Sequence, residues 1–227
     1  MTPTFRAPVF LAVALLAATP ALAQSTATPA PAPTAPAPAA TAQAPSTLPD
    51  IVLGDANAPV TVIEYASFTC PHCAAFHDES FDDLKAEYVD TGKVKFIQRD
   101  VYLDQIGLWA GVLARCGGDD KYYAVSDMLF GKQRQWLDAN SGEQLTANLR
   151  KLGTTAGFTD AQMEACWADQ SKVEQLVATF QKNATADGVE GTPTFIIGGE
   201  KVANAPWPQL KAKIDEKLAA TSQPATN

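Results

Sequence analysis

Apolar and polar positions in the second quarter of the chain predict a strand, a helix and a second strand. Residues 60–66 (VTVIEYA) are β-branched or apolar on both faces except at Glu64, which is typical of a buried strand. From Phe76 to Tyr88 the apolar residues recur at helical spacing. Residues 94–100 (VKFIQRD) predict the next strand, so we expect a parallel pair joined by a crossover helix.

The pattern changes in the middle of the chain. From about residue 103 to residue 181, Ala, Leu, Gln, Trp and Lys dominate, which predicts several short helices and a longer one over about 172–186. Residues 194–197 and 200–203 flank two glycines and predict a hairpin, followed by a last helix over about 206–218. Two β-containing segments therefore flank a helical block, which indicates an α/β domain with a helical insertion.

The N-terminus has the layout of a secretory signal peptide. Arg6 precedes an apolar run over 9–18 and the small-residue triplet ending at Ala23, so we expect residues 1–23 to be removed. The run is shorter than the ~20 apolar residues of a membrane span. Residues 24–47 are uncharged and rich in Pro and Ala, which predicts a disordered segment, or a tether if the signal were kept as an anchor.

Charge and cysteine content narrow the function classes. The chain of 227 residues has a net charge of −8 and no basic cluster, which argues against nucleic acid or an anionic membrane surface as a partner. Its four cysteines fit disulfide pairing in an exported protein.

The pair Cys70 and Cys73 carries the candidate chemistry. Cys70 falls where a strand ends and a helix begins, and Pro71 suits the first helical position. Free N–H groups and the partial positive charge of a helix start stabilise a thiolate, and such thiols have pKa values of ~4–7 instead of ~8.5. His72 adds to this effect if it is cationic; otherwise it is an exposed histidine at a helix start.

Other interpretations of these residues remain open at this point. Cys70, Cys73 and His77 supply three ligands for a metal, but no local fourth ligand is apparent, so we expect no metal site. An inert bridge between such close cysteines staples little chain. The Thr192–Pro193 step is either a simple turn or a cis bond, which spacing alone does not decide.

Two motifs together resemble the thioredoxin superfamily, and most closely the DsbA-like thiol oxidoreductases of the bacterial periplasm. They are residues 60–73 (VTVIEYASFTCPHC) and 191–195 (GTPTF), with the helical block between them. The likeness covers about residues 50–220. It implies an α/β fold, a thioredoxin fold with an inserted helical domain. We place the thioredoxin-like domain at 48–103 and 182–222 and the inserted domain at 104–181.

The resemblance also implies roles for individual residues. Cys70 is the exposed sulfur that substrates attack, Cys73 is its buried partner, and Pro193 lies in cis beside their disulfide. Thr192 then offers backbone groups to an extended substrate peptide.

Two further residues and one more cysteine pair complete the expected site. The resemblance implies that Glu64 is a buried acid that accepts or relays the proton of Cys73, with Lys95 as its possible partner. Cys116 and Cys166 lie in the predicted helical block. We expect them to form a structural disulfide in an oxidising compartment, with free buried thiols as the alternative.

These features predict a periplasmic thiol:disulfide oxidoreductase that donates the Cys70–Cys73 disulfide to reduced exported proteins. The resemblance implies reoxidation by a quinone-linked membrane partner of the DsbB type, and we expect a monomer with no cofactor. A disulfide isomerase or reductase of the same superfamily is the alternative, although residues 24–47 do not form the N-terminal dimerisation module of DsbC-type isomerases. A metal-binding or copper-delivery protein is a more distant alternative.

Overall fold

The computed structural model describes residues 46–222. The predicted signal peptide (1–23) lies outside the described residues, and so does the Pro/Ala-rich segment except for Ser46 and Thr47. These two residues accept hydrogen bonds from the side chains of Gln175 and Lys182. Within residues 46–222, no helix combines the length and apolar character needed to cross a membrane.

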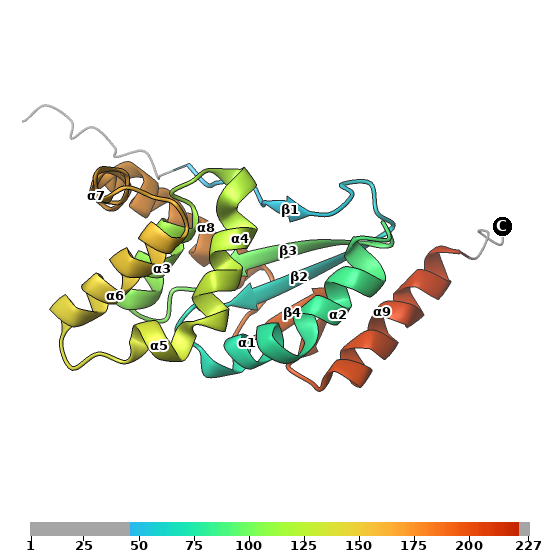
Figure 1. Cartoon of the computed structure of the whole chain (residues 1–227). Helices are drawn as coiled ribbons and strands as arrows, with labels where there is room; N and C mark the ends of the chain where they lie inside the picture. Colours follow the sequence, from blue (N-terminus) through green and yellow to red (C-terminus); the bar gives the residue numbers. More distant parts are fainter. Residues whose placement is uncertain (1–45, 223–227) are drawn as a thin grey trace, which may run out of the picture. The chain divides into compact units, whose positions relative to one another are not determined.

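The strands of the described chain form one sheet in the order β1–β3–β2–β4–β5 (Figure 1). They are β1 (Val52–Leu53), β2 (Val60–Ala66), β3 (Val94–Asp100), β4 (Thr194–Ile197) and β5 (Glu200–Ala203). β2 and β3 are parallel and the other neighbours are antiparallel. The predicted strands and the hairpin are confirmed, whereas β1 has only two residues and is too short to show a sequence period.

A helical run from Pro71 to Val89 joins β2 to β3. It consists of α1 (Pro71–Phe76), α2 (Asp82–Leu84) and two wider π-helical turns, His77–Phe81 and Lys85–Val89. Its apolar side chains pack with those of α9 (Trp207–Thr221) on one face of the sheet. That face is lined by Val60, Val62, Val94, Phe96, Phe195 and Ile197.

The helices between β3 and β4 cluster near the end of the sheet where β2 finishes (Figure 1). They are α3 (Gln105–Ala114), α4 (Asp119–Gly131), α5 (Gln133–Leu137), α6 (Gly142–Thr155), α7 (Asp160–Ala168) and α8 (Gln170–Ala186). Their core is continuous with Phe68, Cys70 and Cys73. The helical block therefore covers the cysteine loop directly.

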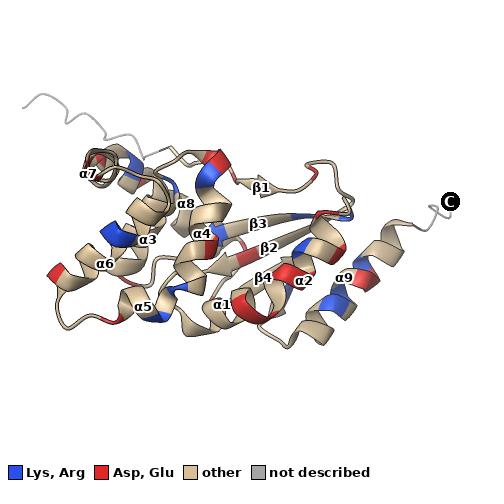
Figure 2. Cartoon of the chain, viewed as in Figure 1, with Lys and Arg blue, Asp and Glu red and all other residues tan. Residues whose placement is uncertain are grey.

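Charged residues of both signs occur along the helices beside the sheet (Figure 2). Lys211 of α9 pairs with Glu87 and donates a 2.7 Å hydrogen bond to the hydroxyl of Tyr88. This contact links α9 to the helical run that begins after Cys70.

Candidate active site

Cys70 is the N-cap residue of α1, at the end of the loop that follows β2. Its backbone is extended, with φ −82° and ψ 120°, and Pro71 occupies the first turn as predicted. The Cys70 N–H donates to the carbonyl of Ser67 at 3.0 Å, which closes a tight turn before the helix. The sequence therefore places this sulfur beside the free N–H groups of a helix start.

The surroundings of Cys70 favour its thiolate. They lower the pKa of Cys70 to about 5. The largest cause is a hydrogen bond from the Cys73 thiol, followed by the Thr192 side chain and the backbone N–H groups of Cys73 and His72, while burial opposes the shift. The neighbouring thiol thus contributes more than the helix start, which was the cause expected from the sequence.

Cys73 has the opposite character. It is fully buried, and its pKa is raised far above its ordinary value. The main cause is its hydrogen bond to Cys70, with burial and the negative charge of Glu64 adding to it. Both cysteines are free thiols here, so the structure describes the dithiol form.

The loop before β4 lies against Cys70. The Thr192–Pro193 peptide bond is cis, as the family resemblance implies. In the thiol form, the Cys70 Sγ donates to the Thr192 carbonyl at 3.4 Å. Antiparallel pairing of β4 with β2 brings these two residues together although 122 positions separate them.

Glu64 is fully buried on β2, as expected, but its partner is not Lys95. The Glu64 Oε2 lies 2.9 Å from the Nε2 of His77. Lys95 is aligned with Thr61, so strand alternation turns it to the other face, where its Nζ donates to the carbonyl of Ala56 at 3.2 Å. The predicted Glu64–Lys95 contact is therefore wrong.

His72 is exposed, whereas both cysteines are buried. The expectation of an exposed Cys70 sulfur is therefore wrong for the dithiol form. Cys70 is only 7% exposed because the helical block and the Thr192 loop pack against it. It lines a hollow of about 500 Å³ between α1 and the loop before α9. Its side chain is not among the causes that lower the pKa of Cys70, whereas its backbone N–H is. Among residues 46–222, no three His, Cys, Asp or Glu side chains are grouped to hold a metal ion.

Two side chains that the sequence argument did not select hold the cysteine loop. The buried Gln133 of α5 donates its amide to the carbonyls of Phe68 and Cys70, both at 2.9 Å. Asp104 caps α3 through the Gly107 N–H and accepts a 2.7 Å hydrogen bond from Thr69. Gln133 follows Cys70 by 63 positions, and no local pattern indicates such a contact.

The two remaining cysteines form a disulfide. Cys116 follows α3 and Cys166 lies in α7, and their Cα atoms are 5.6 Å apart. The expected pairing is confirmed, and the bridge lies within the helical block.

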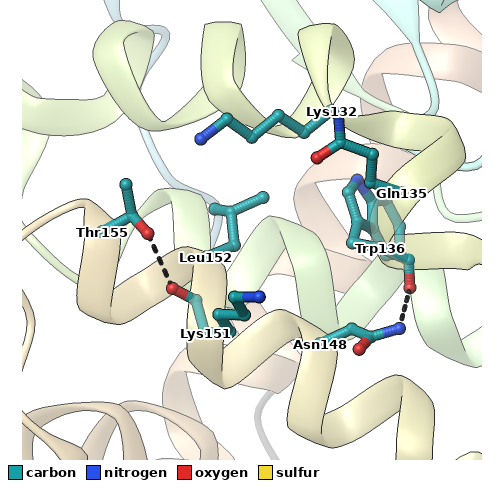
Figure 3. A pocket seen from close by; sticks show the side chains of 7 residues that line it. All are labelled: Lys132, Gln135, Trp136, Asn148, Lys151, Leu152 and Thr155. Carbon is teal, nitrogen blue, oxygen red and sulfur yellow. Dashed lines mark hydrogen bonds between the residues drawn. The ribbon is translucent and has the colours of Figure 1, made fainter.

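A second, smaller hollow lies between α5 and α6 (Figure 3). It has a volume of about 130 Å³ and is lined by Lys132, Gln135, Trp136, Asn148, Lys151, Leu152 and Thr155. The Asn148 amide donates to the Trp136 carbonyl at 3.2 Å, which closes one side. None of the predicted site residues lines this hollow, so the candidate chemistry stays at the cysteine loop.

Comparisons with known proteins agree with this arrangement. Residues 46–216 match the family model described as thioredoxin. A Rickettsia bellii protein named as a protein-disulfide oxidoreductase is 32% identical over 170 residues, which are 74% of this chain and 64% of that protein. The chain thus spans less than two thirds of the length of this relative. Disulfide bond formation protein D of Bacillus subtilis is 26% identical, over 77% of this chain and 79% of its own length.

A solved structure has a similar fold over most of its length. The crystal structure of Wolbachia pipientis alpha-DsbA1 superposes with a TM-score of 0.70 at 28% identity, over 78% of this chain and 94% of that one. The family model covers most of the described residues, and the cysteine loop, the cis-proline and the helical block fit it. The chain therefore belongs to the thioredoxin family, as a DsbA-like member of the thioredoxin superfamily.

Proposed function

We propose that this protein is a thiol:disulfide oxidoreductase that donates the Cys70–Cys73 disulfide to pairs of thiols in exported proteins. The observation that carries the proposal is the opposite character of the two sulfurs. The lowered pKa of Cys70, about 5, makes its sulfur a stable thiolate when it leaves a disulfide. A stabilised thiolate favours the reduced protein, and it therefore favours oxidation of the substrate.

The reaction proceeds by two exchanges. A substrate thiolate attacks the Cys70 sulfur, the Cys70–Cys73 bond breaks, and Cys73 leaves and takes up a proton. A second substrate thiolate then attacks the substrate sulfur of the mixed disulfide and releases Cys70 as a thiolate. Two electrons pass from the substrate dithiol to the cysteine pair, and the substrate gains one disulfide.

The remaining predicted residues have supporting roles in this proposal. Thr192 and Pro193 lie in the loop just before β4, where the backbone can add an extended substrate segment beside Cys70. Glu64 accepts or returns the proton of Cys73, which its burial and its electrostatic effect on Cys73 support. Pro71 and His72 shape the first turn of the helix.

The predicted signal peptide and the relatives support a proposal for location and partners. We propose that the protein acts as a monomer in the periplasm and that a quinone-linked membrane protein of the DsbB type reoxidises it. The Bacillus subtilis relative is named for disulfide bond formation, which supports the direction toward oxidation.

Trapping of intermediates tests the roles of the two cysteines. In the Cys73→Ala variant the Cys70 thiolate attacks the disulfide of an oxidised substrate, that bond breaks, and a mixed disulfide forms. This mixed disulfide is expected to accumulate because no Cys73 thiol is present to release the substrate. The Cys70→Ala variant is the matched control and is expected to accumulate none. Mixed disulfides on Cys70→Ala alone would overturn the assignment.

A redox titration tests the direction of the reaction. Equilibration of the cysteine pair with glutathione is expected to give a potential well above that of thioredoxin. A potential of about −270 mV would indicate a reductant and would refute the oxidase proposal. Efficient rescue of a scrambled disulfide substrate would favour an isomerase instead.

A further inference from the structure

Glu64 and His77 form an isolated buried pair beneath the cysteine loop. The two side chains are 0% and 3% exposed, and the Glu64 Oε2 lies 2.9 Å from the His77 Nε2. The other oxygen of Glu64 and the Nδ1 of His77 have no hydrogen-bond partner in the described residues. The pair therefore has one shared hydrogen bond and one unused polar atom at each end.

The rest of the His77 ring contacts aromatic side chains. It stacks on Phe130 with ring centroids 4.0 Å apart, and it lies 4.7 Å from the ring of Phe81 and 5.5 Å from that of Phe76. These rings do not titrate and exclude water. Glu64 is thus the polar partner of the His77 ring in the described residues.

Other charged groups lie further along the sheet. Gln98 of β3 is aligned with Glu64 and donates to Asp100 at 3.1 Å. Asp100 in turn accepts from Tyr122 of α4 and pairs with Arg115, which follows α3. The amide of Gln98 therefore separates this second carboxylate from the Glu64–His77 pair.

Cys73 is the neighbour that needs a proton. Cys73 lies on the same helical run, four positions before His77. The backbone N–H of His77 donates to the backbone carbonyl of Cys73. The Cys73 sulfur is fully buried, so water does not reach it directly. A neighbouring buried group can therefore supply the proton that Cys73 takes up on reduction, and Glu64 is close enough for its charge to act on Cys73.

We propose that His77 is a positioning residue that, with Glu64, holds the proton which Cys73 receives when the disulfide is reduced. This inference rests on the proposed function and adds His77 to it. The incoming thiolate forms its bond to the Cys70 sulfur, the Cys70–Cys73 bond breaks, and the proton moves from the Glu64–His77 pair to Cys73. The pair later regains a proton from solvent, and no further oxidant or reductant takes part.

The test measures how fast a small dithiol, dithiothreitol, reduces the oxidised full-length protein between pH 6 and pH 8. Each rate is divided by the thiolate fraction of the reagent at that pH. The wild-type rate is expected to stay nearly constant. In the His77→Gln variant the amide still bonds to Glu64 but takes up no proton, so the corrected rate is expected to fall about tenfold by pH 8.

Two further variants separate this role from packing. Phe81→Leu removes a ring beside His77 but no proton site, and it is expected to keep the flat wild-type profile. Glu64→Gln is expected to reproduce the fall of His77→Gln and serves if that variant does not fold. A flat profile in His77→Gln or in Glu64→Gln, with the wild type fully reducible, would overturn this inference but not the proposed function. Failure of Cys73→Ala to trap mixed disulfides would instead refute the proposed function.

Discussion

Replacing Cys73 by Ala is expected to raise the pKa of the Cys70 thiol. The hydrogen bond from Cys73 is the largest cause of the lowered value of about 5. A hydrogen bond to a charged group contributes about 1.5–3 kcal/mol, and one pKa unit corresponds to about 1.36 kcal/mol. Its loss should therefore move the pKa to roughly 6–7, where the Thr192 side chain and the helix start still lower it.

The matched control is Cys73→Ser. Its hydroxyl still donates to the Cys70 sulfur, so the pKa of Cys70 is expected to stay near the wild-type value. Both variants lack the second thiol, and both allow Cys70 to be titrated without an internal disulfide. The difference between them isolates the donated hydrogen bond.

The assay is the rate at which Cys70 attacks a small pyridyl disulfide from pH 3.5 to pH 9. A single rate at pH 7 is uninformative. There, a pKa near 5 ionises about 30-fold more thiol than in free cysteine, yet its thiolate attacks roughly 25- to 60-fold more slowly. The two effects nearly cancel, so the midpoint of the rate profile has to be measured.

Identical midpoints for the Ala and Ser variants would refute the reasoning, provided that circular dichroism shows both to be folded. The helix start and Thr192 would then account for the lowered pKa. Midpoints at about pH 8.5 in both variants would remove the basis for a stabilised Cys70 thiolate.

Two further predictions concern stability. Gln133→Leu leaves two carbonyls of the cysteine loop without their donor. It should lower the free energy of unfolding in urea by about 2 kcal/mol or more. An unchanged unfolding midpoint would show that water replaces the amide. Replacing both Cys116 and Cys166 by Ala should lower the free energy of unfolding by about 4 kcal/mol on the chain-entropy model. Reduction of the Cys116–Cys166 bridge in the wild type should cause the same loss. A loss below about 1 kcal/mol would argue against that model.

Local patterns were sufficient for most of the strands and for the motif that carries the chemistry, although not for the two-residue β1. The strands 60–66 and 94–100 are dense in β-branched and apolar residues, and the structure has them at these bounds. The position of Cys70 at a strand–helix junction also follows from local pattern, because Pro71 begins the helix. Each of these features depends on residues close together in the sequence.

The register between parallel strands, in contrast, cannot be read from local sequence patterns. The crossover helix between β2 and β3 does not fix which residue of one strand faces which residue of the other. Sequence alone therefore allows Lys95 as a neighbour of Glu64, whereas its alignment with Thr61 places it on the other face of the sheet. Gln133 was out of reach for a related reason, since its contact with the cysteine loop depends on how a distant helix packs.

His77 lies between these two cases. Its position four residues after Cys73 places both on one side of a helical run, and this spacing is visible in the sequence. Strand alternation places Glu64 on the same face as Val60 and Val62, which the helical run covers. Combining the two periods would have indicated a contact between His77 and Glu64 without any knowledge of register. The contact therefore depends on two periods at once, that of the helical run above and that of the strand beneath, whereas the helical spacing alone indicates only a third metal ligand.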